Sequence, residues 1–271
     1  MSPLPSIEEL LRRQRLYYEI VSAAQRRRAW GVIGINPANP TSRDSNHAYL
    51  EIALAPDRLA PVLGEVGEAY RAASLVPLLR FHIPPNIETL LKRAQALGWR
   101  LEDDDCFDET WRAWPVDRGH AEPPAVPGMT ISVVRGEALE DLLVVHNDGV
   151  DETAAFRQRN VWSALCAYRG TDCVLARIAG EPAGALACIW DGEWGAIENV
   201  QTRERFRRRG IASAMIRAAQ RFAAERGAAG LYLYDTEEGP DRIYARAGFE
   251  LVARVRAVAL WLPAPSAPRA G

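Results

Sequence analysis

The chain has 271 residues, of which 48% are hydrophobic and 25% are charged, and its formal net charge is −2. This length and apolar content suit one large or two ordinary globular domains. No apolar run approaches the ~18 to 20 residues of a membrane span, and the first residues lack an apolar signal core, so we expect a cytoplasmic protein without membrane contact.

The first half of the chain resembles a degenerate copy of the second half. The segment "YLEIALAPDRLAPVLGEVGEAYRAA" from Tyr49 occupies the place that "AIENVQTRERFRRRGIASAMIRAAQRFAA" from Ala196 occupies later. Near the end of each half, "LLKRAQALGWRLE" and "RIYARAGFELV" both predict a helix, a Gly-aromatic pair and a strand. We therefore predict two similar domains in tandem, although chance resemblance between two α+β domains remains an alternative.

A segment rich in proline and glycine, "WPVDRGHAEPPAVPG", separates the two halves. Such composition is typical of a linker. We expect one domain over residues 1–115, a linker over 116–128, a second domain over 129–262, and a disordered tail over 263–271.

The second half predicts alternating strands and helices. In chain order these are a strand at 129–134, helices within 137–147 and 153–168, three strands within 173–202, a helix after Gly210, a strand at 230–235, a short helix around Tyr244, and a β segment at 249–262. The glycines between the three strands provide the tight turns that an antiparallel meander needs. The pattern predicts an α+β fold with a mixed, mostly antiparallel sheet flanked by helices.

A run of arginines immediately precedes the helix that starts after Gly210. Helix starts leave several backbone N–H groups without intrahelical partners, and the helix dipole adds partial positive charge there. Gly210 allows a ligand to approach the backbone closely, and Arg207 to Arg209 add formal charge. These features predict a pyrophosphate site; the alternative is a solvated basic loop before an ordinary helix.

Two motifs resemble a known family. The segment Arg207 to Ala212, "RRRGIA", matches the (Q/R)xxGx(G/A) signature of the GNAT superfamily of acyl-CoA-dependent N-acyltransferases. The segment Ile243 to Glu250, "IYARAGFE", is similar to the closing Tyr-x-x-x-Gly-Phe motif of that family. The resemblance covers residues 129–262 and implies a GNAT fold, acetyl-CoA as the acyl donor, and no metal.

The resemblance also implies which residues bind the donor. The backbone near Val200 and Thr202 would contact pantetheine, and the amides from Arg208 to Ser213 would surround the pyrophosphate. The implied cofactor-binding residues are Val200, Thr202, Arg207, Arg208, Arg209, Gly210, Ile211, Ala212 and Ser213. For Arg203 and Arg205, contact with the adenosine 3′-phosphate and simple exposure to solvent both remain open.

Acyl transfer to an amine requires a neutral nucleophile and a protonated leaving thiol. Presenting a lysine-like amine in neutral form at pH 7 costs about 4.6 kcal/mol, so a base or a water chain must help. Glu198 is the candidate base because regular strand alternation puts it on one face with Val200 and Thr202; a bulge would change which side chain points inward. The resemblance implies that Tyr244 donates the proton to the thiolate, or else forms an aromatic wall.

Other chemistries have weaker support. The four cysteines lack metal-ligand or CxxC spacing, so we predict free thiols, and the single lysine, Lys92, leaves little scope for a lysine nucleophile. No histidine lies in a recognisable partner motif, so direct transfer in a ternary complex is preferred to a ping-pong route. His146 and Asp148 belong either to the acceptor pocket or to a helix-ending polar turn.

We therefore expect an N-acetyltransferase that transfers an acetyl group from acetyl-CoA to a small-molecule primary amine. One alternative keeps the fold and changes the donor to another acyl-CoA, a carrier-protein thioester or aminoacyl-tRNA; another is a non-catalytic CoA-binding module. In the first half, Pro61, Glu65 and Glu68 replace the arginine turn. We expect that half to bind no CoA, because carboxylates repel a diphosphate, and to form a wall of the acceptor cleft or an interface.

Overall fold

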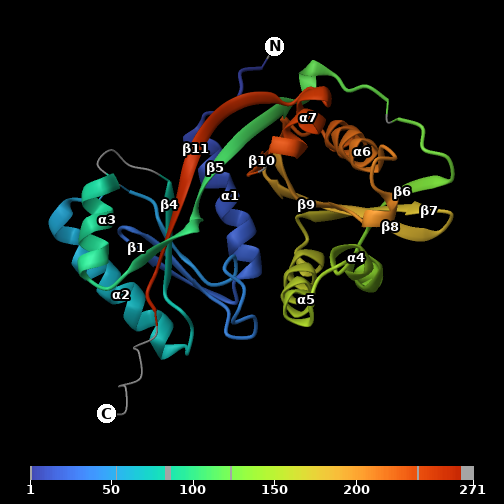
Figure 1. The fold of residues 1–271 in the computed structure, drawn as a ribbon. Helices are drawn as coiled ribbons and strands as arrows, with labels where there is room; N and C mark the ends of the chain where they lie inside the picture. The colour runs from blue at the N-terminus through green and yellow to red at the C-terminus, as the bar shows by residue number, and fades with distance from the viewer. Residues whose placement is uncertain (1, 53, 83–86, 123, 237, 264–271) are drawn as a thin grey trace. The chain divides into compact units, whose positions relative to one another are not determined.

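The computed structural model describes residues 2–52, 54–82, 87–122, 124–236 and 238–263. Its internal contacts divide the chain into two compact units (Figure 1). Unit 1 comprises Met1–Val21 and Glu109–Arg254, and unit 2 comprises Ser22–Asp108 and Val255–Gly271. All but the first residue of the predicted tail lie outside the described residues.

Unit 1 is built on a mixed sheet with the strand order β5-β10-β9-β8-β7-β6. The strands are β5 (Arg100–Pro115), β6 (Met129–Val134), β7 (Thr171–Ile178), β8 (Glu181–Asp191), β9 (Trp194–Thr202) and β10 (Gly230–Asp235). Neighbours pair antiparallel except for β9 and β10, which are parallel. The predicted α+β class, with a mostly antiparallel sheet, is confirmed.

Helices cover both faces of this sheet. They are α1 (Ile7–Val21), α4 (Leu139–His146), α5 (Glu152–Ala167), α6 (Ile211–Glu225) and α7 (Glu238–Arg246). Figure 1 shows α6 and α7 on one side of β8 and β9, with α4 and α5 on the other. The apolar face of α6 is buried against Leu186, Ile197 and Leu231, which confirms the amphipathic helix predicted after Gly210. No helix in the described part of the chain combines the length and apolar character needed to cross a membrane.

Unit 2 contains strands in the order β1-β2-β3-β4-β11, which belong to the same 11-stranded sheet as the strands of unit 1. Its elements are β1 (Ala24–Arg28), β2 (Gly31–Ile35), β3 (Ala48–Leu50), α2 (Leu59–Ala72), β4 (Leu78–His82), α3 (Ile87–Ala96) and the second part of β11 (Glu250–Trp261). Strands β3 and β4 are parallel and are connected through α2, whose buried residues pack into the core of this unit. Unit 2 therefore repeats the arrangement of β9, α6 and β10.

The two units also share a local helix ending. Gly98 follows α3 with φ +86°, and Gly248 follows α7 with φ +84°. The next residue donates its backbone N–H back into the helix in both cases, from Trp99 to Ala94 at 3.0 Å and from Phe249 to Tyr244 at 3.1 Å. Left-handed glycines of this kind end helices without a Cβ penalty. The internal repeat inferred from sequence thus has a structural counterpart in these two turns.

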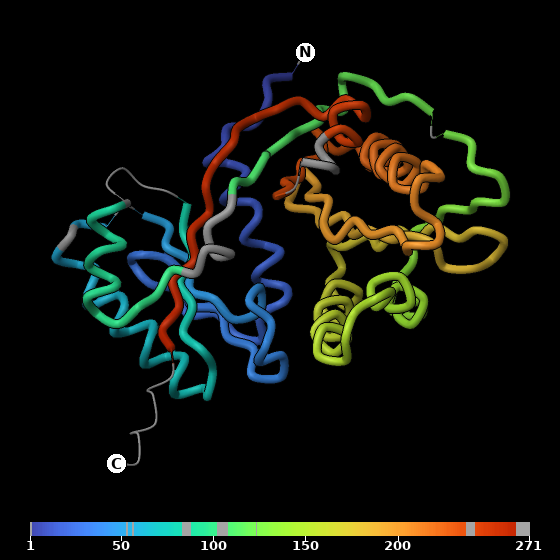
Figure 2. The backbone as a smooth tube through the Cα atoms, in the orientation of Figure 1, coloured from blue at the N-terminus to red at the C-terminus, as the bar shows by residue number. Residues whose placement is uncertain are grey.

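The boundaries of the units differ from the expected ranges 1–115 and 129–262. Helix α1 belongs to unit 1, and β5 and β11 each belong partly to both units. Residues 110–115 of β5 pair with β10 in unit 1, whereas residues 257–261 of β11 pair with β4 in unit 2. Figure 2 follows the chain along these two long strands. The last strand of each half therefore pairs with a strand of the other half.

Candidate functional site

The sheet of unit 1 opens between its two parallel strands. Strands β9 and β10 pair only from Trp194 to Ala196 against Gly230 to Tyr232. Beyond this register, β9 continues to Thr202 and β10 continues to Asp235. The two strands diverge over these residues, so backbone groups of β9 that would otherwise pair with β10 become available to a ligand.

A β-bulge in β9 lies next to this opening. Glu198 pairs with Ala187 and Gln201 pairs with Ala185, so three steps along β9 match two steps along β8. Asn199 lies inside the bulge with φ +53°. Directly opposed residues in an antiparallel pair share a face, so Glu198 and Gln201 both lie on the face of the two alanines.

The bulge corrects the expected orientation of Glu198. Thr202 pairs with Gly184, where a Cβ would meet Met215 of α6, so Thr202 lies on the α6 face. Val200 packs against the core cluster beneath α6. The expectation that Glu198 shares a face with Val200 and Thr202 is wrong, because the extra residue inverts the alternation. Glu198 instead faces the side of the sheet that α1, α4 and α5 cover.

The arginine turn adopts a backbone shape suited to anions. Arg208 and Gly210 both have positive φ, at +62° and +84°. Gly210 is the N-cap residue of α6 and provides no side-chain cap for the first amides of the helix. A left-handed conformation costs a non-glycine residue about 1–2 kcal/mol, and such strain is typical of functional turns. The turn combines this backbone with the N-terminus of a 15-residue helix.

A cavity of about 890 Å³ lies over this turn and the diverging end of β9. Every residue predicted to bind the cofactor lines it except Arg209. The lining also includes Tyr244 and four residues that the sequence analysis missed: Gln201, Phe206, Ile216 and Ile243. Glu198 does not line this cavity, which agrees with its orientation toward the other face.

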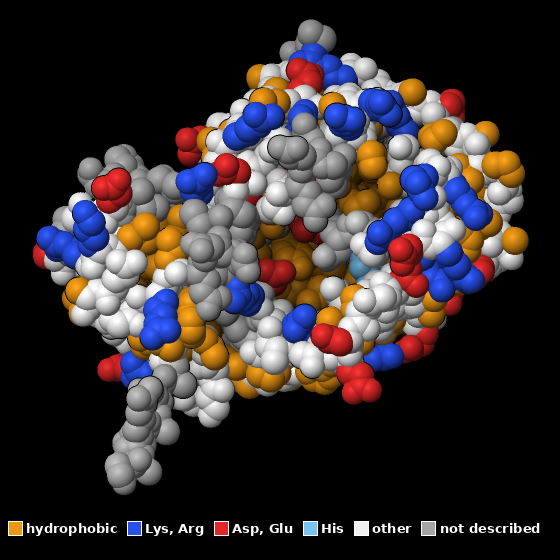
Figure 3. All heavy atoms as spheres, in the orientation of Figure 1, with side chains coloured by type: hydrophobic (Ala, Val, Ile, Leu, Met, Phe, Trp, Pro, Cys, Tyr) orange, Lys and Arg blue, Asp and Glu red, His pale blue; other side chains and the backbone are white. Residues whose placement is uncertain are grey.

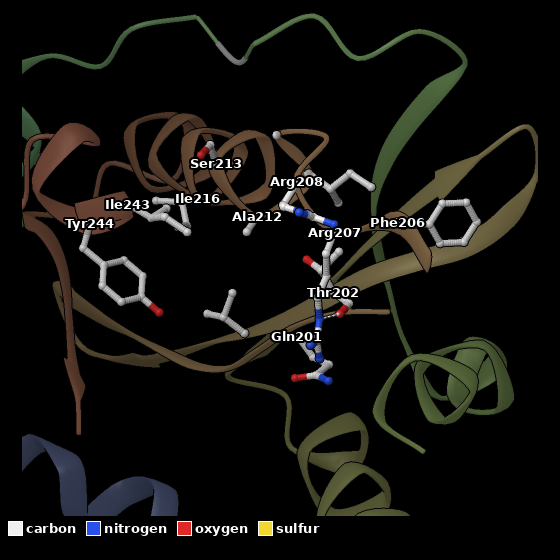
Figure 4. A pocket seen from close by; sticks show the side chains of 13 residues that line it. Gln201, Thr202, Phe206, Arg207, Arg208, Ala212, Ser213, Ile216, Ile243 and Tyr244 are labelled. Atoms are coloured by element: carbon white, nitrogen blue, oxygen red, sulfur yellow. Dashed lines mark hydrogen bonds between the residues drawn. The ribbon is translucent and has the colours of Figure 1, made fainter. Parts of the chain in front are cut away.

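The polar groups are concentrated at opposite ends of the cavity. Figure 4 shows Arg207, Arg208 and Thr202 at one end, whereas Tyr244 points into the cavity from α7 at the other. Arg207 Nε donates to the backbone oxygen of Thr202 at 3.2 Å. The Tyr244 ring is buried and contacts Phe249 edge-on, with 6.3 Å between ring centroids. Along its length, the cavity therefore has a cationic end at the arginines, an apolar lining between the two ends, and the phenol of Tyr244 at the other end.

Three arginines that do not line the cavity pack around the ring of Phe206. Guanidinium groups of Arg203, Arg205 and Arg209 lie 5.8, 4.9 and 5.5 Å from the centroid of its ring. Arg203 also donates to Glu181 at 2.8 Å, so its charge is partly neutralised within the protein. Figure 3 shows Lys and Arg side chains gathered on this part of unit 1. Positive charge is therefore concentrated locally in a chain of net charge −2.

Helix α1 contacts the predicted base. Gln14 donates from Nε2 to Glu198 Oε1 at 2.7 Å, and Arg13 donates to the backbone oxygen of Asp191 at 2.8 Å. Tyr232 lies close by: burial, followed by the negative charges of Glu198 and Asp191, raises the pKa of Tyr232 well above 10. The N-terminal helix, expected in a separate domain, is part of the unit that carries the candidate site.

His146 and Asp148 have structural contacts. The His146 ring packs 4.4 Å from that of Trp162, and the Asp148 carboxylate accepts the backbone N–H of Glu204 at 2.7 Å. Neither residue lines the cavity. The helix-ending polar turn is therefore the better account of this segment, and Asp148 additionally holds the residues that precede the arginine turn.

The buried His146 leads to a prediction about acid stability. Burial lowers the pKa of His146 from 6.5 to about 3, so the folded protein keeps the ring neutral while the unfolded chain protonates it below pH 6.5. Stability is therefore full above pH 6.5 and is lost as pH falls toward 3. We expect His146 to lower the unfolding free energy by about 2 kcal/mol between pH 7 and pH 5. Urea titrations at both pH values, monitored by tryptophan fluorescence, measure this change.

The matched variant is His146→Phe, which keeps an aromatic ring against Trp162. Its loss of unfolding free energy between pH 7 and pH 5 should be about 2 kcal/mol smaller than that of the wild type. Equal losses in the two proteins would show that the ring does not titrate on unfolding. His47 is unchanged in the variant and contributes equally to both measurements.

The described side chains form no metal-binding cluster, and two of the three described cysteines are disfavoured as nucleophiles. No group of three or more His, Cys, Asp or Glu residues there is arranged to hold a metal ion. Cys166, Cys173 and Cys188 are free, with 3.7 Å between the sulfurs of the first two. Burial raises the pKa of Cys188, and the Cys166 contact and burial raise that of Cys173, which disfavours both as nucleophiles.

Comparisons with known proteins identify the fold. Residues 137–249 match the acetyltransferase (GNAT) family. A search of curated proteins found no significant match. Among solved structures, a GCN5-related N-acetyltransferase from Kribbella flavida is similar over 97% of this chain and 98% of its own, with a TM-score of 0.71 and 20% identity.

Two further structures extend the likeness. A functionally unknown conserved protein from Staphylococcus epidermidis is similar over 88% of this chain and 92% of its own, with a TM-score of 0.64 and 15% identity. A tandem GNAT protein from the clavulanic acid biosynthesis pathway is similar over 90% of this chain and 86% of its own, with a TM-score of 0.55 and 16% identity. At these identities the structures show the fold alone. Residues 137–249 thus match the GNAT family, and the solved structures show a GNAT-like fold over most of the chain.

Proposed function

We propose that the chain transfers an acetyl group from acetyl-CoA to a small-molecule primary amine, by direct attack in a ternary complex. The observation that carries this proposal is the cavity whose arginine turn and helix N-terminus lie at one end and whose Tyr244 lies at the other. The arginine turn and the helix N-terminus favour binding of a diphosphate. The Tyr244 phenol at the other end can donate a proton to a leaving thiolate.

The proposed roles follow from where the side chains lie. Amides of the turn from Arg208 to Ser213 bind the diphosphate, and the diverging backbone of β9 at Val200 and Thr202 binds the pantetheine arm. Ile216 and Ile243 line the apolar part of the cavity beside Tyr244 (Figure 4). The donor supplies the acetyl group and a thiolate leaving group. The acceptor amine approaches through the opening between β9 and β10, from the face on which Glu198 lies.

The proton balance assigns one task to each proposed catalytic residue. An ammonium group loses one proton to Glu198, directly or through water, and becomes a neutral amine. Its nitrogen forms a bond to the carbonyl carbon and loses a second proton to water, while the carbon–sulfur bond breaks and Tyr244 protonates the sulfur. The Tyr244 phenolate then takes up a proton from water, and the proton on Glu198 passes to solvent. One proton is released to solvent for each amide formed. No step in this route needs a cysteine or a metal ion.

Thiol release from acetyl-CoA in the presence of a panel of primary amines tests the proposal, with the matching alcohols as controls. We expect amine-dependent release and initial-velocity lines that intersect, as a ternary complex requires; parallel lines would indicate a ping-pong route. CoA binding without any transfer would support a non-catalytic binding module.

Calorimetry should show one CoA bound per chain, because Glu65 and Glu68 occupy the corresponding region of unit 2.

A further inference from the structure

Helix α1 carries a polar residue in the middle of its buried stripe. The buried residues of α1 are Leu10, Gln14, Tyr17 and Val21, a spacing that forms one face of a helix. Gln14 is only 3% exposed. An amide in this position must find hydrogen-bond partners within the protein, because burial removes it from water.

The amide of Gln14 is only half satisfied. Its Nε2 donates to Glu198 Oε1 at 2.7 Å, a short bond of the charge-assisted kind. A carboxylate only accepts hydrogen bonds, so this contact fixes which end of the amide faces Glu198. The other end, Gln14 Oε1, is buried and has no hydrogen-bond partner among the described residues.

This arrangement is unfavourable for folding compared with an apolar residue. A buried acceptor without a partner costs about 1–3 kcal/mol, and leucine would continue the stripe from Leu10 to Tyr17. The contact does, however, hold one oxygen of the Glu198 carboxylate in place. Arg13 anchors the same helix turn to Asp191 at the end of β8, so the amide is held on a fixed element.

We propose that Gln14 is a positioning residue, which holds the Glu198 carboxylate in the orientation needed to accept the proton of the acceptor amine. The inference rests on the proposed function of Glu198. It makes the N-terminal helix a working part of the acceptor side of the site, which residues 109–254 alone would lack. Without Gln14, the carboxylate on the bulged strand would lose a charge-assisted bond and the orientation that this bond fixes.

A double-mutant cycle tests this inference, with kcat and kcat/KM measured for benzylamine and acetyl-CoA in Gln14→Leu, Glu198→Gln and the double variant. Gln14→Leu should lower kcat about tenfold, as expected for one charge-assisted bond, and leave the KM for acetyl-CoA unchanged. In the Glu198→Gln background the same substitution should have no further effect, because no base remains to be positioned.

Stability separates a positioning role from a purely structural one. Gln14→Leu should unfold within about 2 °C of the wild type, since the loss of the bond to the half-buried Glu198 is offset by removal of a buried unsatisfied oxygen. Gln95→Leu, the same substitution at an exposed position of α3, should change neither activity nor stability. Benzylamine turnover with equal Gln14→Leu effects in both backgrounds would overturn this inference alone. Absence of turnover with every amine of the panel would overturn the proposed function and this inference together.

Discussion

Replacing Tyr244 by phenylalanine is expected to lower kcat for amine acetylation about 100-fold, the scale of a single general-acid contribution. The substitution keeps the buried ring and its edge-on contact with Phe249, so the wall of the cavity is preserved. Only the hydroxyl is removed, and the departing thiolate would then have to take its proton from water. Steady-state kinetics with acetyl-CoA and the best amine of the panel measure the change.

Donor affinity distinguishes the two roles that the sequence leaves open for Tyr244. If the phenol is the acid, Tyr244→Phe lowers kcat while the Kd for CoA in calorimetry stays within about twofold, since one ring replaces another. If the residue is only an aromatic wall, kcat is unchanged. Tyr168→Phe is the matched control, because that tyrosine lies on the surface at the end of α5 and outside the cavity.

Local signals predicted the backbone conformation of the arginine turn and the helix that follows it. Gly210 has the left-handed backbone and N-cap position that its motif implies, and α6 buries the face that its periodicity predicts. These features depend on residues close in sequence, because helix propensity and capping are decided by neighbouring residues. Phe206 was missed because an aromatic residue among arginines has no distinct local pattern, although a cation–π platform is a reasonable reading of such a segment.

The proposed acceptor side depends on contacts that no local pattern contains. The face of Glu198 is decided by one extra residue at Asn199, and the strand pattern around it fits either alternation. Gln14 could have been noticed as a polar position in the apolar stripe of α1, but its partner lies 184 residues away. A long-range partner is chosen by the tertiary fold, which periodicity within a helix does not specify.

The boundaries of the two compact units also depend on long-range contacts. Composition predicts a boundary between two halves of the chain, but strand pairing is decided between elements, and β5 and β11 each pair with a strand of the other half. Their lengths of 16 and 12 residues, against a usual five or six, are the signal that sequence reading could have used. A strand that long has enough residues to belong to both units.

Gly210→Asp is expected to raise the Kd for acetyl-CoA about 50-fold, equivalent to about 2.3 kcal/mol, relative to Gly210→Asn. Aspartate and asparagine have nearly the same shape, and both tolerate the left-handed conformation that φ +84° requires. A Cβ at this position would meet only Val126, at 3.8 Å, so either side chain fits. The two variants differ in one negative charge beside the proposed diphosphate.

Salt and stability make the comparison decisive. Repulsion between exposed charges is screened, so the ratio of the two Kd values should shrink at 1 M salt, where the Debye length is about 3 Å. An anion at a helix N-terminus stabilises the helix by about 0.3–1 kcal/mol, so Gly210→Asp should unfold no more easily than Gly210→Asn while binding the donor more weakly. Equal Kd values for the two variants would mean that the diphosphate lies elsewhere, because a charge at the N-cap of α6 cannot leave a neighbouring diphosphate unaffected.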